Sequence, residues 1–358
     1  MKKKIFKSAL SLVLVGVLAL GFTGCGSNSK GSANSDQTSQ VGSSSASKQT
    51  GTKKDSDLTP FRIGIGGSAG ASIVESAGLA IQNGYFEEEL AKVGYVPEYV
   101  YFSGAGPEIN EAFAGQKIDA AIVGDFPTLV AKSNGIDNTI VAVTNQKVNY
   151  GILTTVKGAK TIEDLEGKTA VVFGGSITQF FWQSYLQKKG VDYDSIPTVN
   201  STDATTLLTS GDAQIYPVTA YMSYTLEEKG LGHVIDTSDS DIWTTFVFEV
   251  SSKLLKENDE IGTAVNKALI RAAKAAQDDP KGYYKALAGD MVSASAWEKY
   301  YSADPTLANL SPEITDEMIK YYKNENKWLL DNGVIKNSVD ISTFVNTSYY
   351  EKAKKELK

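Results

Sequence analysis

The chain has 358 residues, with 35 lysines and arginines against 42 aspartates and glutamates, and a formal net charge of −7. Removing the four lysines among the first seven residues takes away four positive charges and leaves −11, and such an acidic body argues against nucleic acid as a partner. Only Arg62 and Arg271 are arginines, so a guanidinium clamp for an anion has at most two candidates.

The N-terminus has the pattern of a secretory signal. Met1–Lys7 is basic, Ala9–Phe22 is apolar, and Thr23-Gly24 are small residues before Cys25. The apolar run is too short to span a bilayer comfortably. The ending Phe-Thr-Gly-Cys resembles the bacterial lipobox, which implies a signal peptide over residues 1–24 and a lipid on the sulfur of Cys25. The alternative is an ordinary signal peptide with an incidental cysteine.

Residues 25–57 form a Ser/Gly-rich stretch with almost no apolar side chains. Such a composition cannot bury enough surface to offset the entropy of ordering, so we expect a flexible tether between a lipid anchor and the body. Cys25 is the single cysteine of the sequence, so neither an internal disulfide nor a cysteine metal site is expected.

Strands and helices alternate from residue 61 onward. The pattern predicts strands at 61–65, 97–102, 118–123 and 139–144. It predicts helices at 73–82 and 126–134, and between them a helix whose first residue is Pro107. This alternation indicates a parallel α/β sheet. Glycine turns follow the strands at 103–106 and 124–127, so two helix N-termini should point at one crevice that suits an anion or a polar ligand.

The alternation restarts after residue 146 and yields a second α/β unit. Its predicted strands are 151–155, 169–173, 198–199, 213–216 and 233–236, and its helices are 161–165, 177–189, 203–208 and 220–229. Residues 244–250 read as a strand that returns to the first unit. The remainder is mostly helical, with helical runs at 261–277, 280–287, 294–301 and 314–332. Ser311 is the predicted cap of the last helix and Pro312 its predicted first residue. We therefore predict lobe one over 58–146 and 244–358, and lobe two over 147–243.

Four segments resemble one known family. Phe102–Pro107, Gln116–Pro127, Ile162–Thr169 and Ser210–Ala213 are similar to the nitrate/sulfonate/taurine-type substrate-binding proteins of ABC importers, within a similarity that runs from about Phe61 to Asp331. The resemblance implies an α/β, two-lobed periplasmic-binding-protein type II fold with a helical C-terminal region. It also implies a monomer without cofactor or metal, held by its lipid at the outer face of a bacterial membrane, whose lobes close on a small molecule and present it to a permease.

The ligand is expected against the turns that end the strands, where small residues let the backbone approach it. The ligand-binding candidates are Ser68, Ala69, Ser103, Gly104, Gly124, Asp125, Phe126, Asn149, Ser176, Ile177, Thr178, Tyr221 and Phe246. Asp125 has two interpretations, a cap of its own helix or a partner for the cation of a zwitterion such as taurine. Asn149 is either hinge structure or a ligand amide. Phe126, Phe181, Tyr221, Trp243 and Phe246 form either a stacking wall or ordinary core.

Tyr221 lies where members of the family often have a Trp-Asp-Pro segment, and this departure leaves the ligand open. A sulfonate or taurine fits an arginine-poor crevice, and nitrate or a thiamine-pyrimidine precursor are the rivals. The enzyme alternative is a pyrimidine synthase of the same fold, which carries a histidine and a cysteine-rich iron segment. This chain has only His233 and Cys25 for those roles, so we expect a binding protein, with a ligand-presenting sensor as the third possibility.

Overall fold

The protein builds two five-stranded sheets, and the computed structural model describes residues 58–67, 75–198 and 201–358 of it. The predicted signal peptide, Cys25, the tether, Ser68 and Ala69 lie outside these residues. Among the helices of the described part, none has both the length and the apolar character needed to cross a bilayer.

The first sheet is mixed rather than parallel. Its strands run in the order β2-β1-β3-β10-β4, which are Tyr95–Phe102, Thr59–Gly66, Ala120–Gly124, Thr244–Ser251 and Asn138–Val148. β1 pairs in parallel with β2 and β3, whereas β10 is antiparallel to both β3 and β4. The prediction of an all-parallel sheet was wrong because β10 is inserted by the chain as it returns from the second sheet, and therefore runs the opposite way.

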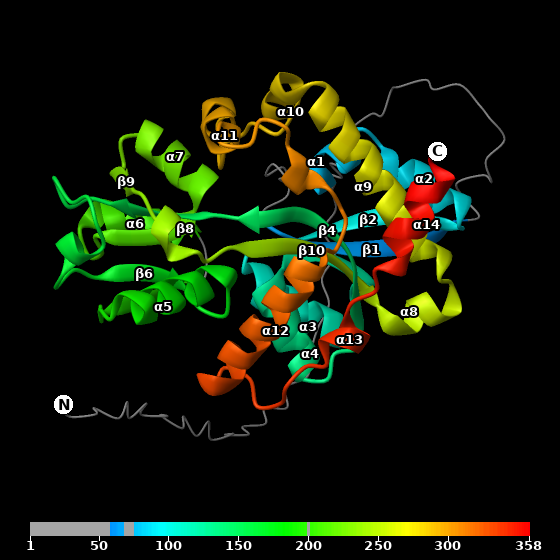
Figure 1. Cartoon of the computed structure of the whole chain (residues 1–358), viewed down its shortest axis with the longest axis horizontal. Coiled ribbons are helices and arrows are strands. Elements are labelled where there is room, and N and C mark those ends of the chain that lie inside the picture. The colour runs from blue at the N-terminus through cyan, green and yellow to red at the C-terminus, as the bar shows by residue number, and fades with distance from the viewer. Residues whose placement is uncertain (1–57, 68–74, 199–200) are drawn as a thin grey trace, which may run out of the picture. The chain divides into compact units, whose positions relative to one another are not determined.

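The second sheet has the order β7-β6-β8-β5-β9, with bounds Ser195–Thr198, Ala170–Phe173, Ile215–Thr219, Tyr150–Thr154 and His233–Ile235. β6 is parallel to β7 and β8, and β5 is antiparallel to β8 and β9. Its helices are α5 (Ile177–Lys189), α6 (Ser201–Ser210) and α7 (Ala220–Glu228), drawn with their sheet in green in Figure 1. The chain thus passes between the sheets at Val148–Tyr150 and again at 236–244.

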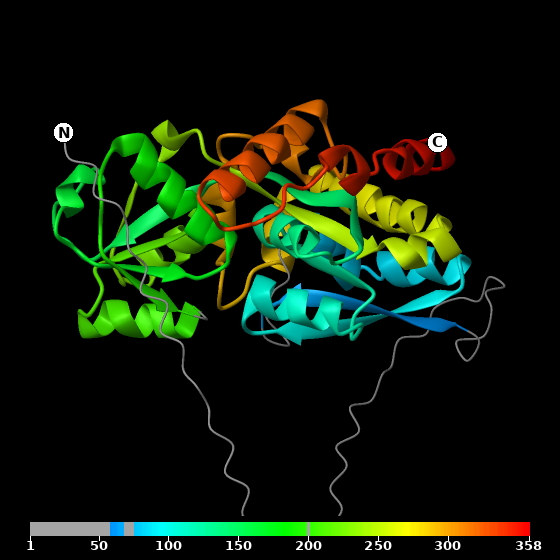
Figure 2. The same cartoon turned by 90° about the horizontal axis from the view of Figure 1, so that it is seen from below.

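Helices cover both faces of the first sheet (Figures 1 and 2). α1 (Glu75–Gln82), α2 (Tyr85–Lys92) and α9 (Glu260–Asp278) lie on one face, and α3 (Ala105–Ala114), α4 (Asp125–Ser133) and α12 (Asp316–Asp331) on the other. Both faces of the sheet need a cover because successive side chains of a strand point to opposite faces, as two neighbouring residues of β10 show. Phe248 packs in the apolar cluster of α2 and α9, whereas Val247 packs in that of α4 and α12.

α9 lies against the first sheet through a stripe of small and aliphatic residues. Ala268, Leu269 and Ala272 are fully buried, and the lysines and Arg271 of the helix lie on its other faces. Pro280 ends it because proline lacks an N–H and restricts the residue before it. Asp279 then caps α10 (Pro280–Ala286) by accepting from the N–H of Gly282 at 3.0 Å.

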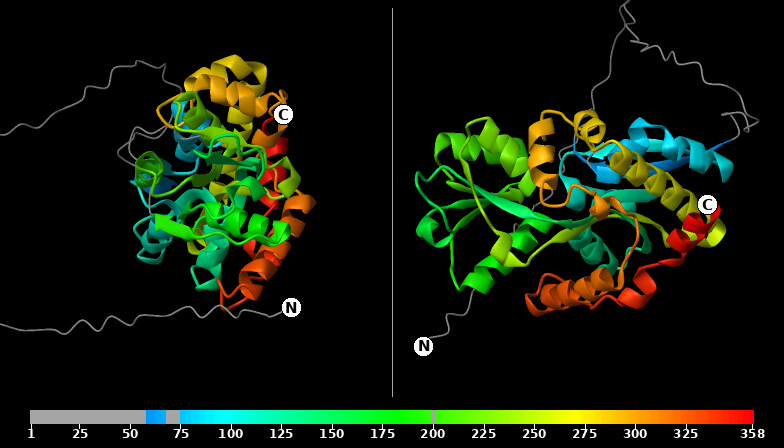
Figure 3. Two further views of the ribbon diagram at one scale, coloured as in Figure 1. Left: turned by 90° about the vertical axis from the view of Figure 1, so that its left-hand side faces the viewer. Right: turned by 45° about the horizontal axis from the view of Figure 1, so that its top comes forward.

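The remaining helices surround these layers. They are α8 (Ser252–Glu257), α11 (Ala294–Tyr301), α13 (Ile341–Phe344) and α14 (Ser348–Glu356). α14, the red C-terminal helix of Figure 3, packs along α9, where Lys267 pairs with Glu356. The sequence patterns did not predict α2, α8, α13 or α14, since each is short and lacks a long apolar stripe.

Several predicted helix starts were wrong by a few residues, among them those of α12 and α3. α12 begins at Asp316, with Thr315 as its cap, because the carbonyls of Ser311 and Glu313 accept from the Gln146 amide and that of Pro312 accepts from Val143 N–H. α3 begins at Ala105 rather than at Pro107. There the Glu108 carboxylate accepts from the Gly104 N–H at 2.9 Å and closes the turn earlier.

Candidate functional site

The strand-ending turns of the two sheets meet face to face. A Cβ added to Gly124, after β3, would lie 2.4 Å from Cγ2 of Ile177, the first residue of α5. A Cβ added to Gly175 would lie 3.2 Å from Cγ of Pro107. Turns from β2, β3 and β6 therefore touch, although the first two belong to one sheet and the third to the other. The glycines permit this approach because any side chain there would overlap its neighbour.

Not every predicted residue of these turns points across the interface. Gly124 and Ile177 meet directly, while Ser103 is exposed and Thr178 half-buried. Ser176 holds its own turn, because its hydroxyl donates to the carbonyl of Phe173 at 2.8 Å. The backbone N–H of Gly104 is taken by Glu108.

Asp125 is completely buried and joins the first helix after β3 to the returning strand. Its Oδ1 accepts from the Phe126 N–H at 2.9 Å, and its Oδ2 accepts from the N–H and the hydroxyl of Thr245 at 2.7 and 3.0 Å. Gly124 occupies the cap position of α4, which has no side-chain cap. Asp125 is thus the first residue of the helix, and its carboxylate binds both the first turn of α4, through the Phe126 N–H, and β10, through Thr245.

A second buried acid, Glu325 of α12, lies beside Asp125 and escaped the sequence analysis. It is 2% exposed, and neither of its carboxyl oxygens has a hydrogen-bond partner among the described residues. Burial, and then the charge of Asp125, raises the pKa of Glu325 well above its usual range. Burial raises the pKa of Asp125 too, against the opposing hydrogen bonds from Thr245. The proton of this pair therefore belongs on Glu325, since Asp125 has the donors.

The sequence offered no signal for Glu325, because an acid on an amphipathic helix ordinarily faces water. Hydroxyls complete the surroundings of the pair. The hydroxyls of Thr245 and Tyr322 lie 2.7 Å apart, and those of Tyr150 and Thr244 lie 3.0 Å apart. Tyr150 starts β5 and Thr244 starts β10, so this last bond joins the two crossings of the chain.

The aromatic candidates form the packed interior of the interface. The ring centroids of Phe126 and Phe180 of α5 lie 6.1 Å apart, and those of Phe180 and Trp328 lie 5.1 Å apart. Phe181 stacks on Tyr150 at 4.5 Å. Phe246 is half-buried between the two main apolar clusters, and Trp243 stacks on Tyr321 at 3.7 Å. In this conformation these rings contact one another across the sheets.

Tyr300 of α11, which the sequence analysis did not single out, contacts both Tyr221 and Asn149. Tyr221 is 2% exposed, and its ring lies 4.5 Å from that of Trp297 and 5.3 Å from that of Tyr300. The Asn149 N–H donates to the Tyr300 hydroxyl at 3.4 Å, while the Asn149 side chain is exposed. Tyr300 lies far from both along the chain, so no local pattern could have joined them.

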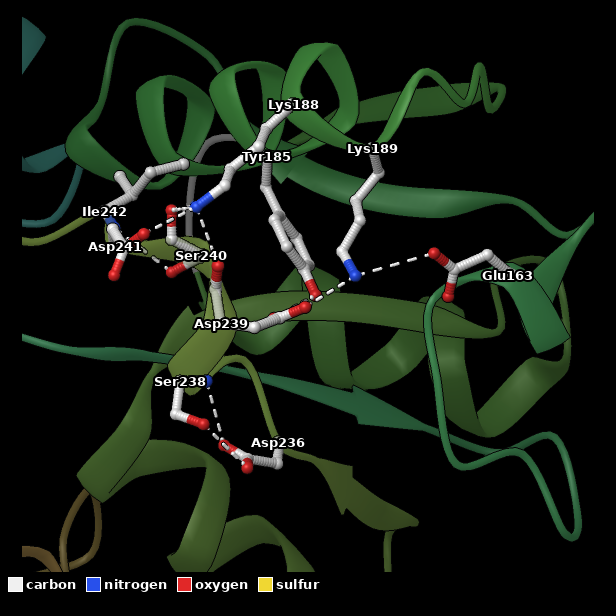
Figure 4. Close-up of polar contacts among 10 residues, drawn as sticks. All are labelled: Glu163, Tyr185, Lys188, Lys189, Asp236, Ser238, Asp239, Ser240, Asp241 and Ile242. Carbon is white, nitrogen blue, oxygen red and sulfur yellow. Dashed lines mark hydrogen bonds and ion pairs between the residues drawn. The ribbon is translucent and has the colours of Figure 1, made fainter.

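The second crossing is tied firmly to α5 (Figure 4). Lys188 Nζ donates to the carbonyls of Asp239 and Ser240 at 2.8 and 2.9 Å and to the Asp241 carboxylate at 2.8 Å. The Tyr185 hydroxyl donates to Asp239 at 2.9 Å, and Lys189 pairs with the same carboxylate at 2.5 Å. The loop from 238 to 241 is therefore held against α5, a helix of the second sheet.

Both arginines form ion pairs at a distance from the turns that meet between the sheets. Arg62 pairs with Asp119 at 2.7 Å, and Arg271 pairs with Glu88 and Glu89 at 2.6 and 2.7 Å. The interface between the sheets is accordingly acidic and aromatic, with backbone N–H groups and hydroxyls as its donors.

The described residues contain no group of three His, Cys, Asp or Glu side chains placed to hold a metal ion. His233 is engaged, since its Nε2 lies 2.8 Å from the carbonyl oxygen of Ala159. A surface hollow lies beside the two crossings of the chain and is lined by residues of β5, α7 and β9, which include Tyr150, Gly151, Tyr224, Asp236 and Thr237.

Two mixed sheets flanked by helices, with the chain crossing twice between them, define the periplasmic-binding-protein class of fold. The family described as NMT1/THI5 like matches residues 77–283, more than half of the chain, and the protein belongs to that family.

Individual proteins resemble the chain over nearly its whole length. The "Putative aliphatic sulfonates-binding protein" of Bacillus subtilis (strain 168) is 23% identical over 354 residues, which cover 96% of each chain. The solved structure of the putative periplasmic sulfonate-binding protein SsuA from Methylobacillus flagellatus KT has a TM-score of 0.69 and 25% identity, covering 84% of this chain and 95% of its own. The fold alone is shared with the desulfurization enzyme DSZB, which has a TM-score of 0.61 and 14% identity and covers 83% of this chain and 100% of its own.

The contact of Gly124 with Ile177 can be tested by a double-mutant cycle. Gly124 has φ −71° and ψ 156°, which alanine adopts freely, so Gly124→Ala should destabilise only by crowding Ile177, by about 1–3 kcal/mol. Adding Ile177→Ala removes the crowded side chain, and the double variant should be more stable than the two single effects predict. Urea unfolding measures all three.

Gly174→Ala is the matched control, because a Cβ there meets nothing within 4 Å, and it should change stability by less than about 0.5 kcal/mol. Strict additivity of Gly124→Ala and Ile177→Ala would show that the turns do not touch in solution.

The buried acid pair predicts a pH dependence of stability. The folded protein holds the Glu325 proton at a pH where the unfolded chain has released it, so stability falls as pH rises above the ordinary glutamate pKa of 4.5, by up to about 1.4 kcal/mol per pH unit for one proton. Glu325→Gln cannot ionise and should make this fall shallower between about pH 5 and pH 9 in urea titrations, with the remainder coming from Asp125, Glu75 and Glu249, whose pKa values burial also raises. Glu351→Gln, at an exposed position of α14, should leave the slope unchanged, and equal slopes in all three proteins would refute a buried carboxyl at 325.

Proposed function

We propose that the protein is the extracytoplasmic solute-binding component of an ABC importer, which captures a small sulfonate between two hinged lobes and delivers it to a permease. The observation that carries this proposal is the meeting of the strand-ending turns of two sheets at one interface, in a chain that resembles sulfonate-binding proteins over nearly its full length. A ligand seated between such turns would contact both sheets at once.

The lobes in this proposal are residues 58–146 with 244–358, and residues 147–243. The hinge consists of the two crossings, which are joined by the hydroxyls of Tyr150 and Thr244. Since the 238–241 loop is tied to α5, bending falls on the short segments next to Tyr150 and Thr244. A ligand shifts the balance between open and closed forms only by its differential affinity for the closed form.

Binding without catalysis belongs to the same proposal. The single histidine is bonded to a backbone carbonyl, and the acids of the interface are buried against hydroxyls and rings rather than paired with a nucleophile. The binding surface includes Gly124, Asp125, Phe126 and Ile177 at the turns, with Asn149, Tyr221 and Phe246 around them. Ser68, Ala69, Ser103, Gly104, Ser176 and Thr178 complete the proposed set.

A thiamine-pyrimidine precursor or another aromatic solute is the second candidate. The specific observation in its favour is the composition of the interface, where rings and carboxyl groups are plentiful and both arginines are engaged elsewhere. A flat ring that stacks on Tyr or Phe needs no guanidinium, whereas a sulfonate must rely on N–H groups and hydroxyls.

A thermal-shift screen of the full chain with taurine, alkane- and arylsulfonates, nitrate and pyrimidine precursors tests the solute class. A ligand at about 100 times its dissociation constant adds about 2.7 kcal/mol, which is visible as a shift in Tm. Stabilisation by sulfonates is the expected result. Shifts with pyrimidines alone would keep the importer role and replace the solute, and the absence of any shift would contradict both candidates.

Lipid attachment at Cys25 is the proposed anchor to the outer face of the membrane. The wild-type protein should partition into a detergent phase and take up labelled fatty acid, because diacylglycerol and an acyl chain together anchor stably. Cys25→Ser should stay in the aqueous phase. Equal partitioning of the two proteins would contradict the anchor.

A further inference from the structure

We propose that Glu75 is a ligand-recognition residue, which receives a protonated amine of the solute against the rings of Tyr221 and Tyr300. This inference rests on the proposed solute-binding function and narrows it, since it names an organic cation or zwitterion as the class of ligand.

Glu75 is a buried carboxyl group that lacks a cation. It is the first residue of α1 and is 1% exposed. Its Oε2 accepts from the Thr144 hydroxyl at 2.9 Å, while its Oε1 has no partner among the described residues. No lysine or arginine of the described part forms an ion pair with it. Burying a carboxylate under these conditions is costly, and here burial raises the pKa of Glu75 to about 8.

Glu75, Glu249 and Glu325 are buried without an ion pair among the described residues, whereas a glutamate on the helix next to Glu75 is paired with two cations. Glu89 of α2 is 3% exposed and pairs with Lys92 at 2.7 Å and with Arg271 at 2.7 Å. Glu89 and Glu75 are thus buried to a similar degree on neighbouring helices, and only Glu75 is left without a positive partner. An ammonium group that arrives with the ligand would supply the missing charge.

Tyrosines from two other elements lie near this carboxyl group. The charge of Glu75 contributes to raising the pKa of Tyr221, on α7, and of Tyr300, on α11, so both hydroxyl-bearing rings lie within its electrostatic reach. The rings are held by packing, Tyr221 against Trp297 at 4.5 Å and edge-on to Tyr300 at 5.3 Å. A carboxylate with tyrosine hydroxyls nearby is a favourable environment for an organic ammonium, since the hydroxyl oxygens can accept from the cation as well.

An unpartnered donor lies next to the unpartnered acceptor. Asn145 is fully buried, and its Oδ1 accepts from the Asn309 amide at 2.8 Å, while its Nδ2 meets no acceptor at full hydrogen-bond geometry among the described residues. Burial raises the pKa of Glu75, and hydrogen bonding by the side chains of Thr144, Asn145 and Tyr221 opposes that rise, so Asn145 and Tyr221 lie beside the carboxyl group. A ligand with both an amine and an oxygen acceptor would satisfy Glu75 and Asn145 together, which is the arrangement that buried polar groups require.

The test measures the affinity of the full chain, by titration calorimetry, for three probes: 4-(aminomethyl)benzenesulfonate, 4-methylbenzenesulfonate and benzylamine. The wild-type protein should bind the amine-bearing sulfonate at least about tenfold more tightly than the methyl analogue, which corresponds to about 1.4 kcal/mol. Glu75→Gln keeps the size of the side chain and should abolish that preference. Glu249→Gln, a change at another buried glutamate that is bonded to Asn138, is the matched control and should preserve it.

Each outcome decides between the two proposals. Equal wild-type affinities for the two sulfonates, or an equal loss for both in Glu75→Gln, would overturn the role of Glu75 and leave sulfonate binding intact. Binding of benzylamine alone, lost in Glu75→Gln, would support Glu75 and contradict the sulfonate class. If no probe bound the wild-type protein, both would be contradicted. Circular dichroism melts of the variants verify that each one is folded.

Discussion

The structure depends on one buried contact, in which the carboxylate of Asp125 accepts two hydrogen bonds from Thr245. Asp125 lies at the end of β3, and Thr245 lies where the chain re-enters the first sheet after building the second. The contact therefore fixes β10 beside β3 and sets the turn at Gly124 against α5. Removing one partner would leave a buried carboxylate or hydroxyl unsatisfied, which is far more destabilising than the loss of an exposed pair.

The electrostatics of the interface follow from how the chain uses its few guanidinium groups. Arg62 and Arg271 stabilise the outer parts of the first sheet, so the meeting turns contain carboxyl groups, hydroxyls and aromatic rings. At Asp125 the hydrogen-bond donors are accordingly the N–H groups of Phe126 and Thr245 and the Thr245 hydroxyl.

The fold class, most elements and the positions of the turns follow from local sequence. α5 and α11 begin and end at the predicted residues, because Ser176 precedes α5 and the left-handed Gly190 ends it, while Ser293 caps α11. The mixed strand directions of the first sheet did not follow from local sequence, since the direction of β10 depends on where a distant segment of the chain inserts. The starts of α3 and α12 were misplaced for the same kind of reason, because Glu108 and Gln146 satisfy backbone groups that an isolated segment would leave free.

The sequence by itself determined that glycine turns would end the strands, that Asp125 would follow one of them, and that arginine would be scarce. Only the tertiary structure decided which of these residues touch. It brought Gly124 against Ile177, Tyr221 against Tyr300, and Glu325 beside Asp125, and it left Glu75 buried without a cation. Burial is the physical reason: a side chain's charge, partners and chemistry depend on what surrounds it, and those neighbours come from segments more than fifty residues away along the chain.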